Sequence, residues 1–99
     1  MIRHTVIWRM AADDAETRAE HAAEVARLLE GLVGVIPVIR SLSVGVNVAV
    51  PESNADVALV IDLDDLAALD AYQTHPAHQE VAGYIRSVTG DRLAVDFEV

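Results

Sequence analysis

A phenol and two imidazoles lie within seven residues of one another in the segment Tyr72–His78. Pro76 interrupts any helix running through this segment, because the residue before a proline disfavours the helical conformation. Imidazole titrates near neutral pH and is the most common acid/base group in enzymes. A tyrosine hydroxyl beside it can orient a carbonyl group or stabilise an enolate. The segment therefore predicts proton abstraction next to a carbonyl, or isomerisation of a small ketone-like compound, with His78 as the base and Tyr72 as its partner.

The same side chains also have structural interpretations. Tyr72 could hold its ring in the core and its hydroxyl at the rim, and His78 could be a satisfied core histidine. We expect His75 to cap the helix that follows it, because it precedes Pro76. A metal site remains an alternative, since His75 and His78 are spaced i, i+3 and His4 could be a third ligand. No carboxylate stands at a recognised ligand spacing, so we predict chemistry without a metal or other cofactor.

Hydrophobic periodicity predicts the elements that must position these residues. The order β-α-β-β-α-β is that of ferredoxin-like α+β folds. We therefore expect residues 1–99 to form one domain, in which the helices cover one face of a four-stranded antiparallel sheet. The expected elements are a strand over Met1–Met10, a long helix with Asp13 as its N-cap, strands over Pro37–Val50 and Val57–Ile61, a short helix capped by Asp64 or Asp65, another short helix from Pro76, and a last strand after Gly90.

The sheet face away from the helices should also be apolar. Hydrophobic residues make up 53% of the chain, more than one thin sheet and one helical layer can hide. We expect that face to present residues such as Val6, Trp8, Leu59 and Ile61, which must be kept from water. Two copies could pair their sheets and form a closed barrel. The predicted homodimer would then enclose a cavity lined by His4, Val6 and Trp8.

The composition excludes several classes of partner and site. Seven basic against sixteen acidic residues give a net charge of -9, which argues against nucleic acid or an anionic membrane as the main partner. The absence of cysteine excludes disulfides, thiolate nucleophiles and thiolate zinc sites. No apolar run resembles a signal peptide or approaches bilayer length, so we expect a cytoplasmic protein.

The chain resembles the stress-responsive A/B barrel domain (Dabb) family over almost its whole length. The His-Pro-x-His element in the β-α-β-β-α-β context is the most specific match. The resemblance implies a homodimer whose sheets pair into an α+β barrel. The matching residues are His4, Ile36-Pro37, Gly45 and Asn47, His75-Pro76-Ala77-His78, Tyr84, Arg86-Ser87 and Asp96-Phe97.

The resemblance also implies an activity. In the plant polyketide-cyclase branch of the family, a Tyr and a His at the positions of Tyr72 and His78 form the acid/base pair of a cofactor-independent, aldol-type ring closure on a linear polyketide thioester. His4 matches a further pocket histidine, whereas another pocket histidine of that branch aligns with Val57. Bulky aromatic positions of the branch correspond to Val25, Leu29 and Thr89 here, so the pocket should have a different shape and substrate.

Further residues are predicted to contact a ligand. Arg92 could hold a carboxylate or enolate oxygen if the last strand turns it inward, or it could be a rim arginine paired with an acidic side chain. The full set of predicted substrate-binding residues is His4, Val6, Trp8, Val25, Leu29, Leu59, Ile61 and Arg92.

Three functions remain open at this point. The first is a homodimeric barrel that binds a small apolar carbonyl or polyketide-like compound and acts as a cyclase, lyase or isomerase through Tyr72 and His78. The second is a non-catalytic, stress-responsive protein that holds a hydrophobic metabolite. The third is a cofactor-free monooxygenase acting on an electron-rich phenol.

Overall fold

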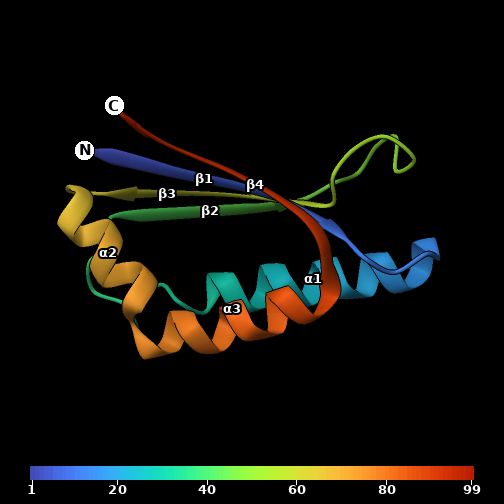
Figure 1. Ribbon diagram of the computed structural model, residues 1–99, viewed down its shortest axis with the longest axis horizontal. Coiled ribbons are helices and arrows are strands. Elements are labelled where there is room, and N and C mark those ends of the chain that lie inside the picture. Colours follow the sequence, from blue (N-terminus) through green and yellow to red (C-terminus); the bar gives the residue numbers. More distant parts are fainter.

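The computed structural model describes residues 1–99 and shows a ferredoxin-like α+β fold with one four-stranded antiparallel sheet and three helices. The fold class expected from the sequence is confirmed. Figure 1 shows the sheet as one layer and the two longer helices as a second layer beneath it. The elements are β1 (Ile2–Met10), α1 (Ala15–Glu30), β2 (Ser41–Val46), β3 (Val57–Leu63), α2 (Leu66–Thr74), α3 (Pro76–Val88) and β4 (Thr89–Glu98).

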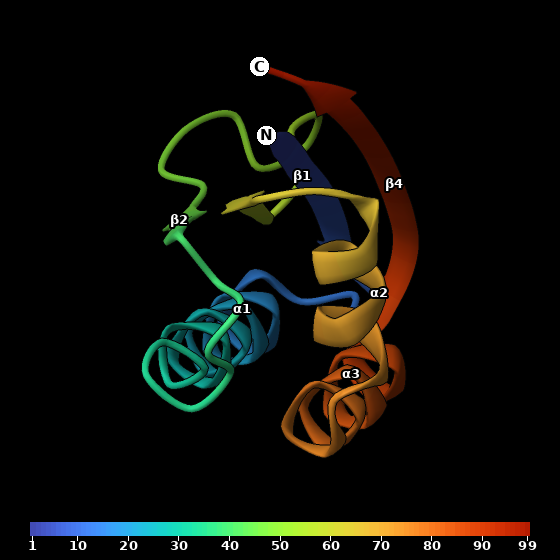
Figure 2. The same cartoon turned by 90° about the vertical axis from the view of Figure 1, so that its left-hand side faces the viewer.

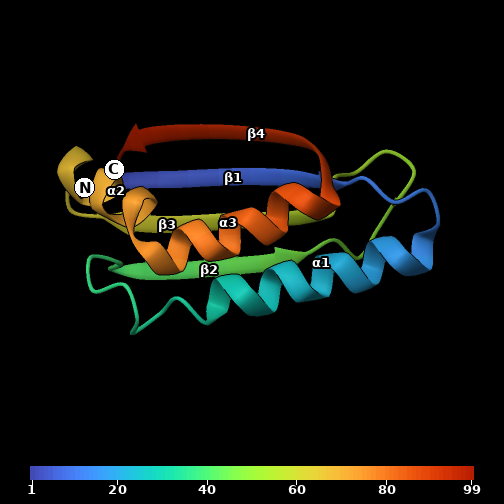
Figure 3. The same ribbon diagram turned by 60° about the horizontal axis from the view of Figure 1, so that its bottom comes forward.

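The strands run in the order β2-β3-β1-β4, so the first and third strands occupy the centre. Figure 3 shows α1 and α3 side by side across this sheet. Figure 2 shows that all three helices lie on the same side, and that the edge strand β4 curves toward α3. The last strand therefore bends out of the sheet toward the last helix.

The two faces of β1 differ in burial. Alternate residues of a strand point to opposite faces, and here Val6 and Trp8 are buried toward the helices while Ile7 is exposed. The partner residues of Val6 and Trp8 on β3, Leu59 and Val57, share the helix-covered face. The expectation that Val6, Trp8, Leu59 and Ile61 lie on the face away from the helices is wrong. The amphipathic helices need an apolar surface to pack on, and they cover the more apolar face of the sheet.

The opposite face of the sheet is open. Leu93, Val95 and Phe97 of β4 alternate with the inward-facing residues and are exposed, together with Ile7 of the neighbouring strand. Ala58 of β3 lies on the same open face and is also exposed. The chain by itself therefore covers only one face of its sheet.

The long helix α1 begins one residue later than the sequence suggested. The N-cap is Asp14 rather than Asp13, since its carboxylate accepts a hydrogen bond of 2.8 Å from the backbone N–H of Thr17. The apolar stripe of the helix buries Ala22, Val25, Ala26 and Leu29 against the sheet.

The break between α2 and α3 follows the local chemistry. Asp65 caps α2 by accepting from the backbone N–H of Ala68. The imidazole Nδ1 of His75 accepts from the backbone N–H of Ala77 at 3.0 Å, and Pro76 is the first residue of α3. The predicted capping role of His75 is confirmed. This break turns the chain so that residues on both sides of it face the sheet.

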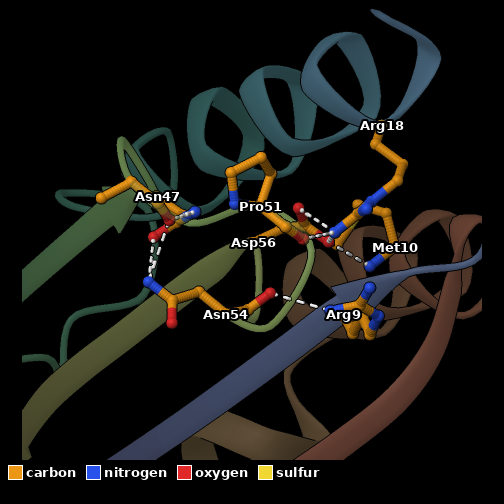
Figure 4. A network of polar contacts seen from close by, with 8 residues as sticks. Arg9, Met10, Arg18, Asn47, Pro51, Asn54 and Asp56 are labelled. Atoms are coloured by element: carbon orange, nitrogen blue, oxygen red, sulfur yellow. Dashed lines mark hydrogen bonds and ion pairs between the residues drawn. The ribbon is translucent and has the colours of Figure 1, made fainter. Parts of the chain in front are cut away.

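The second strand is shorter than Pro37–Val50, because residues 47–56 leave the sheet as a loop held by polar contacts (Figure 4). Arg18 of α1 forms an ion pair with Asp56 at 3.0 Å. The other carboxylate oxygen of Asp56 accepts from the backbone N–H of Met10 at 2.7 Å. The Asn54 carbonyl accepts from Arg9 at 2.9 Å. These contacts fasten the loop to α1 and to the end of β1.

No helix of the structure is both long and apolar enough to cross a bilayer.

Candidate functional site

A cavity of about 530 Å³ lies between the sheet and the helices of the single chain. Its floor is formed by alternate residues of the central strands, and its other wall by one face of α3. It therefore does not lie between two paired sheets, as the sequence analysis expected. The lining consists of His4, Val6, Trp8, Leu29, Leu59, Tyr72, Gln73, His78, Val81, Ala82, Ile85, Arg86, Thr89 and Arg92.

Tyr72 and His78 meet at the wall of this cavity. Tyr72 is in the last turns of α2 and His78 is in the first turn of α3, so the break at Pro76 folds the two rings together. Their ring centroids are 4.6 Å apart with an interplanar angle of 61°, an edge-to-face arrangement. Tyr72 is only 1% exposed. The pair predicted from the sequence is thus brought together in space.

Burial shifts the pKa values of Tyr72 and His78 in opposite directions. It raises the pKa of the Tyr72 hydroxyl, which therefore stays protonated at neutral pH. Burial also lowers the pKa of His78, and the positive charges of Arg86 and Arg92 contribute in the same direction. The backbone of Gln73 raises the pKa of His78 and so opposes the effect of burial. The Nδ1 atom of His78 is buried and has no hydrogen-bond partner. The arrangement combines a neutral imidazole that can take up a proton with a phenol that can donate a hydrogen bond.

His4 forms a second polar contact at the same end of the cavity. It is 3% exposed, and its ring centroid lies 6.0 Å from that of Tyr72. Its Nδ1 is hydrogen-bonded to a carboxylate oxygen of Asp96, the residue opposite it on β4. A carboxylate oxygen only accepts, so Nδ1 of His4 is the donor in this contact. Asp96 thereby holds the imidazole ring of His4 in place.

Six of the eight predicted substrate-binding residues line the cavity and two do not. His4, Val6, Trp8, Leu29, Leu59 and Arg92 line the cavity, and Arg92 faces inward from β4 opposite Trp8. Val25 and Ile61 are fully buried in the core but do not line the cavity. The difference depends on side-chain packing, which alternation alone does not define. Whether any of them contacts a ligand stays a prediction.

Some lining residues were missed by the sequence analysis. Gln73, Val81, Ala82, Ile85 and Arg86 belong to the wall formed by α2 and α3. The i, i+3 and i+4 spacing counted from His78 was the available signal for the α3 residues. Asp96 was also missed as a partner of His4, although its alternation with Arg92 and Ala94 puts it on the same face of the last strand.

The histidines do not form a metal site. The chain contains no group of three His, Cys, Asp or Glu side chains arranged to hold a metal ion. The Nδ1 of His75 is engaged by the N-terminus of α3, and His75 is not part of the cavity lining. The three-histidine alternative is therefore not supported by the geometry.

Comparison with known proteins now identifies the family. The model of the stress responsive A/B barrel domain (Dabb) matches residues 2–99. This chain belongs to that family. The resemblance inferred from the sequence is confirmed, and with it the ferredoxin-like fold of this Dabb domain. No curated protein sequence matches the chain significantly.

Solved structures of similar proteins include dimers. A dimeric protein of unknown function with a ferredoxin-like fold from Bacteroides fragilis is 27% identical, with a TM-score of 0.89 over 99% of this Dabb chain and 95% of that chain. A dimeric ferredoxin-like protein of unknown function from Thermobifida fusca is 30% identical, with a TM-score of 0.84 over 99% and 90%. The hydroxynitrile lyase of Passiflora edulis is 12% identical, with a TM-score of 0.80 over 99% and 92%, and this likeness shows the fold alone.

Proposed function

We propose that this Dabb protein binds a small, mostly apolar carbonyl compound in the cavity and performs acid/base chemistry on it without a cofactor, as a cyclase, lyase or isomerase. The observation that carries the proposal is the edge-to-face contact of Tyr72 and His78 at the wall of a 530 Å³ cavity. A perturbed imidazole and a buried phenol converging on one pocket are typical of proton-transfer sites.

The proposed step begins with neutral His78. Its imidazole removes a proton from the carbon next to the substrate carbonyl, and the electron pair of the broken C–H bond moves onto the carbonyl oxygen. The Tyr72 hydroxyl donates a hydrogen bond to that oxygen as negative charge develops. The enolate then attacks a second carbonyl, expels a leaving group or takes a proton back at another carbon. The imidazolium of His78 returns the proton in each case.

His4 acts as a positioning residue in this proposal. Its ring lies edge-on beside that of Tyr72 and is held by Asp96. A neighbouring ring that is held in place limits the motion of the phenol ring, which reduces the cost of orienting the Tyr72 hydroxyl toward the substrate.

The remaining lining favours an apolar substrate body. Val6, Trp8, Leu59, Val81 and Ile85 are buried side chains that surround the space between the polar groups. Removing apolar surface from water stabilises a bound ligand by about 25 cal/mol per Å².

The functional unit in this proposal is a homodimer formed through the open sheet face. That face carries Ile7, Leu93, Val95 and Phe97, which the single chain leaves exposed. Similar solved structures are described as dimeric. Pairing of two such faces would remove the apolar side chains from water while leaving each cavity within its own chain.

Hydrogen–deuterium exchange tests the chemistry without knowledge of the natural substrate. Butyrophenone is incubated in D₂O with the protein, and loss of the α-proton signal is followed by NMR. We expect the wild type to accelerate exchange, His78→Ala to lower the protein-dependent rate by about a hundredfold or more, and Tyr72→Phe to lower it by about tenfold or more. His21→Ala and Tyr84→Phe are matched controls, since neither residue lines the cavity.

The outcomes separate the competing functions. Circular dichroism and sedimentation establish that each variant is folded and assembled like the wild type. Equal exchange rates in wild type and His78→Ala would reject the acid/base assignment. Binding of the ketone with no acceleration by the wild type would favour the non-catalytic hydrophobic-ligand protein, and oxygen consumption with phenols would favour the monooxygenase.

A further inference from the structure

The seven arginines of the chain fall into three groups. Four form ion pairs with carboxylates: Arg3 with Asp62, Arg18 with Asp56, Arg27 with Glu24 and Arg40 with Asp64. Arg9 donates to the backbone carbonyl of Asn54. Arg86 and Arg92 have neither an ion pair nor a side-chain hydrogen bond, and both line the cavity. In a chain with sixteen acidic residues, the two unpaired guanidinium groups therefore share one pocket.

The backbone positions of these two arginines lie toward the opposite end of the cavity from those of the reactive pair, while their charges still act on His78. Arg86 is in the last turn of α3, whereas His78 is in its first turn, about 12 Å away along the helix axis at 1.5 Å per residue. Arg92 is opposite Trp8, and Asp96 is opposite His4, so these positions are about 13 Å apart along β4. The chain therefore supplies Tyr72 and His78 from one end of the cavity and the two arginines from the other, with apolar residues at the positions between them.

The charge of the rest of the molecule makes this placement significant. A net charge of -9 repels anions in general. Two guanidinium groups without carboxylate partners make the potential at this pocket more positive than over the rest of the surface, because low-dielectric walls focus their field. The nearest inward-facing carboxylate along β4 from Arg92, that of Asp96, is already hydrogen-bonded to His4. The arginine end is thus open to an anion from outside.

We infer that the substrate of this site is an elongated carbonyl compound bearing a carboxylate, with the carboxylate held by Arg86 and Arg92 and the reacting carbonyl at Tyr72 and His78. The inference rests on the proposed function and adds the substrate class. A guanidinium group presents a planar fork of N–H donors that matches the two oxygens of a carboxylate. The apolar residues between the two ends contact the carbon chain or ring that joins the two functional groups.

The test uses a matched pair of probes. In 5-oxo-5-phenylpentanoate an aryl ketone and a carboxylate are separated by a short carbon chain, and 5-oxo-5-phenylpentanamide has the same shape without the charge. Binding of each to the full-length protein is measured by isothermal titration calorimetry. We expect the acid to bind about tenfold or more tightly than the amide, and the preference to weaken as salt concentration rises.

Arginine variants locate the origin of the preference. Arg86→Gln and Arg92→Gln should each weaken binding of the acid by about five- to tenfold and leave binding of the amide almost unchanged. Arg27→Gln is the matched control, because it removes the same charge from the exposed surface of α1.

Three results would overturn the inference: equal affinities for the acid and the amide, no binding of the acid at millimolar concentration, or an equal loss in Arg27→Gln and Arg92→Gln. Equilibrium binding requires no turnover, so these results are independent of the exchange rates that test Tyr72 and His78. An acid preference that persists in His78→Ala, together with no exchange in the wild type, would reject the chemistry and keep the anion site.

Discussion

The two faces of the sheet are made by the same strands but differ in what covers them. On β1, His4, Val6 and Trp8 point to the helices and are buried, whereas Ile7 points the other way and is exposed. On β4 the contrast continues, since Arg92 and Asp96 face the cavity side and Leu93 and Val95 face outward. The helix-covered face therefore contributes both to the core and to the candidate site. The open face carries apolar side chains that nothing in the single chain covers. A period of two residues is enough to give one strand both roles.

Removing a large side chain from each face should show the largest difference. Leu59 is 1% exposed on the helix-covered face, and Leu93 is 73% exposed on the open face. Leu59→Ala should lower the free energy of unfolding by about 2 to 5 kcal/mol, because it leaves a cavity in the packed core. Leu93→Ala should change the stability of a monomeric form much less. Urea denaturation of both variants measures the difference, and equal losses would contradict the distinction between the faces.

A charge on the open face should affect assembly rather than the site. Val95→Asp would place a carboxylate in the proposed sheet–sheet interface, where it loses hydration without gaining a partner. We expect the variant to sediment as a monomer at concentrations at which the wild type is a dimer, with the dissociation constant raised about tenfold or more. Thr5→Asp lies beside it on β1 and should act in the same direction. A wild type that sediments as a monomer would remove the dimer from the proposal.

The pH dependence of stability should show a smaller effect from the helix-covered face. Burial lowers the pKa of His78 in the folded chain, so the unfolded chain binds this proton at higher pH. The contribution of His78 to stability is complete above its unfolded pKa of about 6.5 and is lost as pH falls through the lower folded value. Unfolding free energies measured between about pH 7 and pH 5 should therefore decline less in His78→Gln than in the wild type. An identical decline in both would contradict a depressed pKa.

Local sequence patterns were sufficient for much of the fold. The alternation in Met1–Met10, the helical spacing before Gly31 and the order of the elements predicted the ferredoxin-like arrangement that the structure shows. His75 and Pro76 were expected to end one helix and begin the next, and they do so. These features depend on near neighbours in the chain, such as a missing N–H, a fixed φ or a side-chain acceptor for a helix N-terminus.

The site was less predictable, because it depends on which surfaces meet. Alternation divides Val6 and Ile7 between two faces, but it does not say which face the helices cover. Because the helices were assigned to the wrong face of the sheet, the cavity was predicted between two sheets, whereas it lies between the sheet and the helices. Similarly, both Leu29 and Val25 were named because they correspond to pocket positions of the plant branch, yet only Leu29 reaches the cavity. A rotation of the helix by part of a turn decides whether a side chain lines the pocket or packs in the core.

The sequence by itself determined the order of the elements, the helix break that brings Tyr72 close to His78, and the excess of negative charge, since each depends on residue type and short-range spacing. Only the tertiary structure decided that Asp96 contacts His4 on the neighbouring strand. It also decided that Arg86 and Arg92 line one cavity without carboxylate partners. The physical reason is that these relations follow from strand register and from the packing of helices on a curved sheet, which join residues far apart in the chain.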